Sequence, residues 1–326
     1  MKRREFITLL GGAAGSWPLA ALAQQAAMPV IGFMSSRSPE DSESVVAAFR
    51  KGVSEGGLVE GRNVLLEFRW ARGEYNRLPN LAADLIARRV AVIVSPGMAP
   101  TLAAKAATTT IPIVFLTGAD PVQFGLVASL NRPGGNLTGL TLLNNTLVPK
   151  QLEMLHELVP SATLVAFLVN PKNPISETDT KDLHAAASIT RQQILALDAS
   201  TESDVNDAFT ALTQQGANAL LVQTDPLFNG LHHHIAGLAA RYRVPAVSSL
   251  REFVEAGGLM SYGTALADGN RQLGLYAGKI IKGANPSDLP VEQSAKVELL
   301  INVRAAKALG LSISPSVLAR ADEVIE

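Results

Sequence analysis

The chain has 326 residues, a net charge of −1 and no cysteine, and 47% of its residues are hydrophobic while only 5% are aromatic. The absence of cysteine excludes disulfides, thiolate metal sites and cysteine nucleophiles, and a near-neutral chain without a basic run lacks the charge footprint of a nucleic-acid-binding protein. The length is more than one hydrophobic core usually supports and suits two domains of about 150 residues each.

The first 23 residues have the three parts of an export signal. A basic start with Arg3 and Arg4 precedes a mildly apolar stretch over residues 7–22, and residues 21–23 (Ala-Leu-Ala) form an A-x-A cleavage site. The adjacent arginines favour the twin-arginine route over the Sec route. We therefore expect cleavage after Ala23 and a periplasmic mature chain with no lipoprotein or membrane anchor, because no cysteine follows that site.

Short apolar runs follow in two sets of five, separated by stretches with a hydrophobic period of 3.6 residues. Strands that alternate with amphipathic helices predict parallel sheets covered by helices on both faces. The two sets resemble each other, since Pro112 and Pro245 each open a fourth strand, where a residue without an N–H is tolerated. The predicted strands cover residues 30–34, 64–68, 90–94, 111–116 and 137–142, then 163–169, 193–197, 219–222, 244–247 and 258–260.

This pattern predicts an α/β protein with two Rossmann-like, doubly wound lobes joined by a hinge, and a single large sheet is the alternative. A long helix is expected over 265–282, a strand over 296–302, and short helices from there to the end. The tail over 291–326 is not assigned to either lobe. We assign residues 24–143 and 264–290 to the N-terminal lobe and residues 144–263 to the C-terminal lobe.

The candidate site lies in the loops that follow the strands, because open α/β sheets bind ligands beyond the carboxyl ends of their strands. Helices that begin in these loops direct free N–H groups toward the cleft, which favours a carboxylate or another anion. Each serine, asparagine or aspartate there is equally a candidate for ordinary helix capping. The candidate ligand-binding residues are Ser35, Ser95, Gly97, Met98, Ala99, Thr117 and Asp120 in the N-terminal lobe, and Asn170, Asp225, Ser248 and Tyr262 in the C-terminal lobe.

Motifs of known enzyme classes are missing from the sequence, which contains no G-x-S-x-G, Walker P-loop, H-E-x-x-H or G-x-G-x-x-G. His232, His233 and His234 are consecutive, and consecutive helical residues point about 100° apart. They are therefore interpreted as part of a surface helix rather than as a metal site. No catalytic residue, metal or cofactor is expected.

Several segments are similar to one protein family. They are residues 107–115 (Ala-Thr-Thr-Thr-Ile-Pro-Ile-Val-Phe), 120–127, 132–139 (Arg-Pro-Gly-Gly-Asn-Leu-Thr-Gly), 157–160, 170–174, 251–263, 289–293 and 319–326. Together they resemble the ABC-transporter substrate-binding proteins of the group that includes tryptophan- and phenylalanine-binding members, over nearly the whole mature chain. The resemblance implies a type I periplasmic binding fold whose hinged lobes close on a small solute, and an ABC permease as partner.

One position departs from the pattern of this family. The family usually has Gly-Thr-Pro or Gly-Ser-Pro after the third strand, where this chain has Gly97-Met98-Ala99-Pro100. A thioether thus replaces the hydroxyl expected to hold a ligand carboxylate. Either Ser95 or the backbone at Ala99 takes its place, or the ligand differs from the amino acids that other members bind.

The expected function is capture of a small polar solute, an amino acid or another carboxylate, by a monomeric receptor that delivers it to an ABC permease. Backbone N–H groups would hold a carboxylate, and an aspartate would hold an ammonium group. The alternatives are a binding module for a sensor or chemoreceptor and an exported enzyme on the same fold. The enzyme would need a nucleophile and base in the cleft, and no histidine stands in the loops that end the strands.

Overall fold

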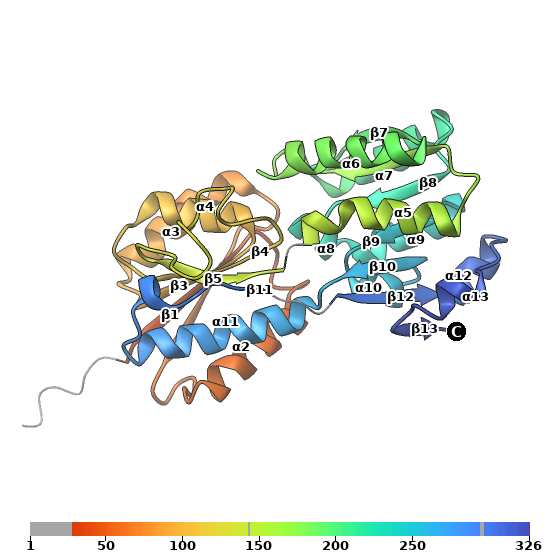
Figure 1. The fold of residues 1–326 in the computed structure, drawn as a ribbon. Coiled ribbons are helices and arrows are strands. Elements are labelled where there is room, and N and C mark those ends of the chain that lie inside the picture. Colours follow the sequence, from red (N-terminus) through yellow and green to blue (C-terminus); the bar gives the residue numbers. More distant parts are fainter. Residues whose placement is uncertain (1–27, 143, 294–296) are drawn as a thin grey trace, which may run out of the picture.

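The computed structural model describes residues 28–142, 144–293 and 297–326, so the predicted export signal lies outside the described residues. The chain forms two α/β lobes, each built on its own sheet (Figure 1). The prediction of two lobes is confirmed, and the alternative of a single large sheet is wrong. Among the described helices, none is long and apolar enough to cross a membrane.

The sheet of the N-terminal lobe has six strands in the order β11-β5-β4-β3-β1-β2, and every pairing is parallel. Its inner strands are buried apolar runs, as expected for parallel strands covered on both faces. The strand order reverses between β1 and β3, which creates the crevice where such sheets bind ligands. The strands are β1 (Val30–Ser35), β2 (Leu65–Trp70), β3 (Val92–Pro96), β4 (Ile113–Thr117), β5 (Leu137–Thr141) and β11 (Glu292–Gln293).

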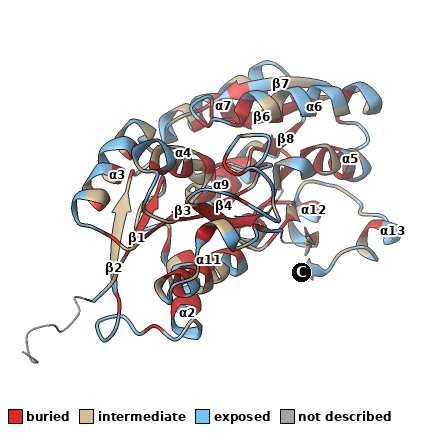
Figure 2. Ribbon diagram, turned by 60° about the vertical axis from the view of Figure 1, so that its left-hand side comes forward, coloured by how far each residue is buried: buried red, intermediate tan, exposed pale blue. Residues whose placement is uncertain are grey.

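Helices cover both faces of this sheet, and their outer sides are exposed while the inner strands between them are buried (Figure 2). One face carries α2 (Glu43–Glu55) and α11 (Leu266–Ile281), and the other carries α3 (Leu78–Ala87) and α4 (Met98–Ala107). Two short 3-10 helices, η1 (Tyr75–Arg77) and η3 (Pro286–Asp288), lie in the connections.

Helices α2 and α11 approach each other closely because glycines face the partner helix. A Cβ added at Gly52 would collide with the carbonyl oxygen of Arg271, and one added at Gly274 would collide with that of Phe49. The contact between these helices holds α11 against the N-terminal lobe, although most strands of the C-terminal sheet precede α11 in sequence.

The sheet of the C-terminal lobe has seven strands in the order β13-β12-β10-β9-β8-β6-β7. The pairing of β10 with β12 is antiparallel and the others are parallel. The order reverses between β6 and β8, so this lobe has its own crevice. The strands are β6 (Leu164–Val169), β7 (Gln193–Asp198), β8 (Ala219–Val222), β9 (Ala246–Ser248), β10 (Met260–Gly263), β12 (Glu298–Asn302) and β13 (Glu323–Ile325).

Helices also cover both faces of the second sheet. On one face lie α5 (Val148–Leu158) and α6 (Ser176–Thr190), and on the other lie α7 (Glu202–Gln214) and α9 (His232–Tyr242). The shorter helices are η2 (Asn144–Leu147), α8 (Pro226–Gly230), α10 (Arg251–Glu255), α12 (Val303–Ala308) and α13 (Pro315–Leu318).

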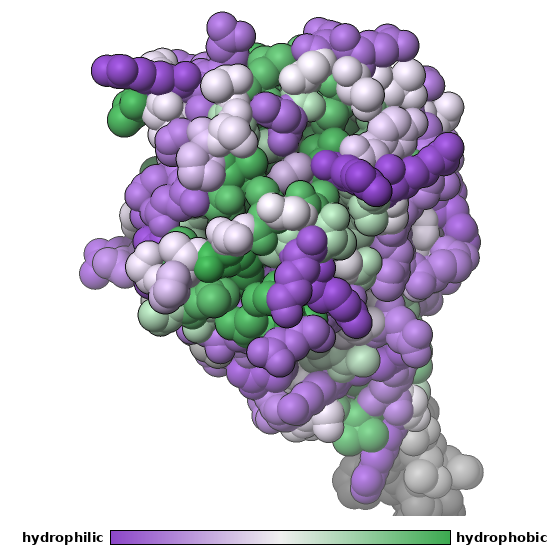
Figure 3. All heavy atoms as spheres, turned by 90° about the vertical axis from the view of Figure 1, so that its right-hand side faces the viewer, coloured by the Kyte–Doolittle hydropathy of each residue, from purple (hydrophilic) through white to green (hydrophobic). Residues whose placement is uncertain are grey.

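The C-terminal tail is divided between the two sheets. Strand β11 joins the first sheet, while β12 and β13 join the second, so the chain passes between the lobes after β5, after β10 and after β11. The expectation that short helices continue to the last residue is wrong, because the chain ends in β13, which pairs with β12. Leu309, Leu311 and Leu318 pack on the core of the C-terminal lobe, and apolar side chains appear among hydrophilic ones on this end of the molecule (Figure 3).

Candidate functional site

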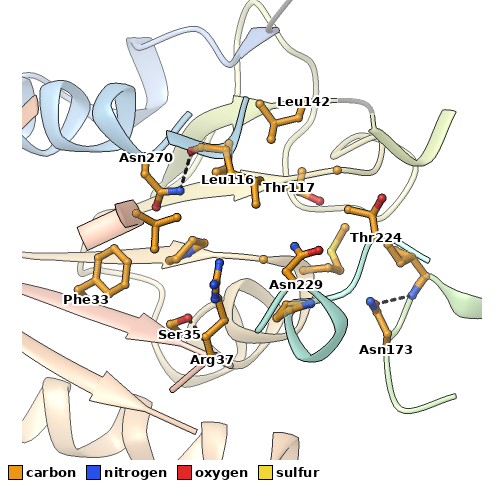
Figure 4. A pocket seen from close by; sticks show the side chains of 18 residues that line it. Phe33, Ser35, Arg37, Leu116, Thr117, Leu142, Asn173, Thr224, Asn229 and Asn270 are labelled. Atoms are coloured by element: carbon orange, nitrogen blue, oxygen red, sulfur yellow. Dashed lines mark hydrogen bonds between the residues drawn. The ribbon is translucent and has the colours of Figure 1, made fainter. Parts of the chain in front are cut away.

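A cavity of about 90 Å³ lies between the two lobes, beyond the carboxyl ends of β1, β3 and β4. Both lobes contribute side chains to its wall (Figure 4). The N-terminal lobe supplies Phe33, Ser35, Arg37, Val45, Pro96, Gly97, Met98, Leu116, Thr117, Gly118, Leu142, Leu266 and Asn270, and the C-terminal lobe supplies Asn173, Ile175, Thr224, Pro226 and Asn229.

Four of the residues predicted from the sequence line this cavity, namely Ser35, Gly97, Met98 and Thr117. The Ser35 and Thr117 hydroxyls each accept the backbone N–H two residues later, at 3.1 Å, so they also shape the loops that leave β1 and β4. Gly97 has φ +114°, a conformation that favours glycine, and places the first turn of α4 beside the cavity.

The predicted residues Ser95, Ala99, Asp120, Ser248 and Tyr262 are not part of the cavity wall. Ser95 is buried and bonds to a threonine hydroxyl of α4 at 3.1 Å, and Ala99 packs at the edge of the core. Asp120 is exposed and accepts the N–H groups of the second and third residues after it. Ser248 accepts an N–H of the following loop, and Tyr262 packs against the core of the C-terminal lobe.

Asp225 and Asn170, also predicted, form a buried network immediately behind the wall. Asp225 caps α8 by accepting the N–H of Leu227 at 2.8 Å, and it accepts hydrogen bonds from Asn170 at 3.3 Å and from Asn173 at 2.8 Å. Its fourth partner is Tyr75 of the N-terminal lobe, whose hydroxyl donates to Asp225 Oδ2 at 2.8 Å. This hydrogen bond joins the two lobes directly across the cleft.

Burial dominates the acid–base properties of this network. Removal from water raises the pKa of Asp225 above its ordinary value of 3.8, although four hydrogen bonds act in the opposite direction. Burial and the neighbouring carboxylate also raise the pKa of Tyr75 well above 10.0. Tyr75 therefore keeps its proton at neutral pH and remains the donor of the bond between the lobes.

Arg37 is the one charged residue in the part of the cavity wall that the structure describes. Its Nε lies 3.2 Å from Asp41 Oδ1, and its side chain is only 12% exposed. Asp41 also accepts a hydrogen bond from the Ser42 hydroxyl at 2.9 Å. A guanidinium held in place in this way presents donors suited to a carboxylate.

The rest of the wall is mainly apolar. Phe33, Val45 and Leu116 come from the sheet and α2 of the N-terminal lobe. Met98 of α4 and Ile175 of the C-terminal lobe belong to the same apolar cluster, so they close the cavity from opposite sides of the cleft. The cavity thus offers a few fixed polar groups in an apolar enclosure, which is typical of small-molecule sites.

The sequence prediction missed Arg37 and Asn173, although both stand in loops that follow strands. It also missed two amides of this wall that helices carry, Asn229 on α8 and Asn270 on α11, because neither stands in a loop directly after a strand. A signal for Asn270 does exist in the sequence, because it falls on the same helical stripe as Leu266 and Leu273, which is the buried face of the helix. A polar residue on such a face marks either a buried hydrogen bond or a ligand.

A second cavity of about 600 Å³ adjoins the first, since Arg37 and Pro226 line both. Its wall carries both signs of charge, namely the cations Arg37, Arg72 and Lys172 and the anions Asp41, Glu74 and Glu202. This wider, polar cavity also lies between the lobes, because its residues come from both.

The three consecutive histidines do not converge on a common point. His232 Nδ1 lies 2.7 Å from the backbone oxygen of Asn229, whereas His234 Nε2 lies 2.9 Å from the side-chain oxygen of Asn206. Throughout the described part of the chain, no group of three or more histidine, aspartate or glutamate residues is placed to hold a metal ion.

Two Rossmann-like lobes with a cavity between their strand ends define a type I periplasmic binding protein, a class that closes on its ligand by hinge motion. The family model described as ABC transporter substrate binding protein matches residues 31–325, and the chain belongs to that family. A curated relative, the tyrosine-binding protein of Clostridioides difficile (strain R20291), is 27% identical over 263 residues, which cover 81% of this chain and 75% of the relative.

Solved structures share the fold. A conserved domain protein from Vibrio cholerae superposes with a TM-score of 0.84 at 24% identity, and an ABC domain from Streptococcus pneumoniae in complex with L-Trp with a TM-score of 0.81 at 24% identity. Each comparison covers 91% of this chain and 99% of the other. The predictions of the type I fold and of the family are confirmed, and the family and its structural neighbours are solute-binding proteins rather than enzymes.

Proposed function

We propose that this chain is the extracytoplasmic receptor of an ABC transporter, and that it captures a small amino acid or a related carboxylate between its lobes and delivers it to the permease. The observation that carries this proposal is the cavity at the strand ends, with Arg37 as its lining cation in a mainly apolar wall. We also propose that the crossings between the sheets form the hinge, with lobe boundaries near residues 143 and 263.

Two features beside the cavity favour an anionic group on the solute. The Arg37 guanidinium is held by Asp41 and faces the cavity. Helix α4 begins at Met98, directly at the wall, and the free N–H groups of a helix N-terminus attract negative charge. The C. difficile relative is named for tyrosine, and the S. pneumoniae structure holds L-Trp, which supports an amino acid as the class of solute.

The size of the cavity favours a short aliphatic body over an aromatic one. Its volume of about 90 Å³ is smaller than the apolar cavity of about 150 Å³ that accommodates benzene in another protein. Met98 occupies space here that a smaller residue would leave open. We therefore expect small branched or linear aliphatic amino acids to bind better than tryptophan.

A binding screen of the mature chain tests this function. Thermal shift and calorimetry with L-amino acids, the corresponding carboxylic acids and neutral sugars should give a Tm increase for the first two classes, because a ligand at a hundredfold excess over Kd stabilises the folded state by about 2.7 kcal/mol. The variant Arg37→Met should lose most of this shift. Shifts with sugars alone would contradict the proposal, and chemical turnover of a compound would favour an enzyme.

Export and delivery are tested separately. We propose that residues 1–23 direct export and are removed after Ala23, so mass spectrometry of the periplasmic fraction should find a chain that begins at Gln24. Loss of solute uptake in cells without this chain would support delivery to a permease. Unchanged uptake together with a lost chemotactic or transcriptional response would instead identify a sensor module.

A further inference from the structure

Asn270 is a polar residue in the buried stripe of α11. Its side chain is only 3% exposed and lines the cavity between the lobes. Its neighbours on that stripe, Leu266 and Leu273, are apolar. An amide is therefore present at a position where an aliphatic side chain would pack equally well.

The orientation of the Asn270 amide is determined by a local hydrogen bond. Its Nδ2 donates to the backbone oxygen of Leu266, one turn earlier, at 2.9 Å (Figure 4). The bond fixes the nitrogen toward the helix backbone and leaves Oδ1 as the free end of the amide. This oxygen is fully buried, and no group in the described part of the chain donates a hydrogen bond to it.

A buried acceptor without a donor destabilises the site, so the bound solute is the natural source of the missing donor. The part of the cavity wall that the structure describes contains no carboxylate. Asp225 lies behind this wall, and its oxygens already accept hydrogen bonds from four donors. Arg37 and the first turn of α4 attract the anionic end of a solute, whereas the oxygen of an amide repels it. Asn270 Oδ1 thus complements a positively charged or neutral donor on the same solute.

We propose that Asn270 recognises the amino group of the solute and makes this receptor selective for α-amino acids over the corresponding carboxylic acids. The proposal rests on the proposed function of the same cavity and adds the second polar contact that defines its substrate class. The structure thereby assigns to an asparagine of α11 the role that the sequence had suggested for an aspartate of a strand-end loop.

Matched pairs of ligands test this selectivity. Calorimetry should compare L-valine with isovalerate and L-leucine with 4-methylpentanoate, and 2-hydroxyisovalerate should separate an amine donor from a hydroxyl donor. The amino acid should bind the native protein at least about tenfold more tightly than its acid, since sites that hydrogen-bond a ligand discriminate strongly against analogues without that group. The hydroxy acid should fall between them.

Variants connect the preference to this residue. Asn270→Leu should reduce the ratio of the two Kd values to near 1, whereas Asn270→Asp, which retains an acceptor, should preserve it. Leu273→Met is the matched control, because Leu273 is buried on the same helix but does not line the cavity, and its ratio should equal that of the native protein. The ratio within each variant is independent of how stable that variant is.

The possible results distinguish a failure of the role of Asn270 from a failure of the proposed function. Equal affinity of the native protein for amino acid and acid overturns the role of Asn270 and leaves a carboxylate receptor. An unchanged ratio in Asn270→Leu, or the same loss in Leu273→Met, also overturns it. If neither member of any pair binds the native protein, the proposed function fails as well.

Discussion

Single side chains from both lobes set the size of the cavity, and Met98 is the one with the clearest effect. It is the second residue after β3, it is 5% exposed, and it packs in the same cluster as Ile175 from across the cleft. A thioether is flexible and fills irregular space. We therefore expect the residue at this position to determine how large a solute the cavity can accommodate.

Replacement of Met98 by alanine should widen the specificity of the site. We expect Met98→Ala to improve the affinity for L-tryptophan relative to L-valine by at least about tenfold, at a cost of about 2–5 kcal/mol in the free energy of unfolding. Calorimetry with both amino acids measures the first effect and urea denaturation the second. Met154→Ala, which empties space in the core of the C-terminal lobe, should lower stability alone, and an unaltered affinity ratio in Met98→Ala would refute the size argument.

Asp225 makes stability depend on pH. Its pKa in the folded state lies above 3.8 because burial penalises the charged carboxylate, so its favourable contribution is complete below that pH and is lost as pH rises through the folded-state pKa. The variant Asp225→Asn does not titrate at this position. The free energy of unfolding of the native protein minus that of the variant should therefore fall as the pH rises above 3.8, the ordinary pKa of an aspartate. Urea denaturation of both proteins measures the difference, and a constant difference would contradict this account.

At the scale of elements, the contact between α2 and α11 depends on the absence of side chains. Gly52 and Gly274 bring the two backbones together, and Gly56 and Gly278 continue the same contact one turn further along each helix. Because the opposing atoms at Gly52 belong to the backbone, a rotamer change cannot relieve a clash there. Any side chain at this position must separate the helices.

We expect Gly52→Ala to lower the free energy of unfolding by about 1–3 kcal/mol, the usual cost of overpacking. Gly237→Ala is a suitable control, since Gly237 also lies within a helix and a Cβ there would meet nothing within 4 Å. Alanine should be neutral or stabilising by up to about 1 kcal/mol at that position. Equal destabilisation by both substitutions in urea denaturation would show that the close approach of α2 and α11 has no special importance.

The sequence could predict the inner strands of each sheet but not the short strands at the edges. The inner strands are runs of Val, Ile, Leu and Phe, and burial on both faces dictates that composition. Strands β11 and β13 carry no such run, since Glu292–Gln293 and Glu323–Ile325 are short and largely exposed. They form because β5 and β12 offer unpaired edges, and a pairing partner distant in sequence leaves no local pattern.

The candidate site also has residues that the sequence could predict and residues that it could not. The rule that ligands bind at strand ends located Ser35, Gly97, Met98 and Thr117 at the cavity. It could not distinguish these from Ser248, whose hydroxyl only serves its own loop. Residues on helices, such as Asn229 and Asn270, come to the site through packing between elements.

At the scale of the whole molecule, the two lobes are in direct contact across the cleft. The hydrogen bond from Tyr75 to Asp225 joins residues 150 positions apart in sequence, and Leu227 and Pro226 of α8 lie against glycine-containing loops of the N-terminal lobe. The arrangement is therefore a closed one, and its stability relative to an open arrangement depends on few polar contacts. This dependence makes the equilibrium between them sensitive to single substitutions.

Removal of the Tyr75 hydroxyl should favour the open arrangement. Tyr75→Phe retains the ring but leaves the buried Asp225 without one donor, and a hydrogen bond to a charged group contributes about 1.5–3 kcal/mol. We expect solute affinity to fall by about tenfold or more and the radius of gyration without solute, measured by X-ray scattering, to increase. Tyr242→Phe, in a tyrosine that packs on Phe209 within the C-terminal lobe, should change neither, and an unchanged affinity in Tyr75→Phe would exclude a role in closure.

The path of the chain has a practical consequence. The described residues begin beside β1 of the N-terminal lobe and end beside β13 of the C-terminal lobe, so the proposed opening of the cleft would move the two ends apart. The sequence has no cysteine, and cysteines introduced near Met28 and Glu326 would therefore be the sole attachment points for a pair of dyes. The distance between those dyes would convert opening and closing into a fluorescence signal, and the protein could then serve as an optical sensor for its own solute.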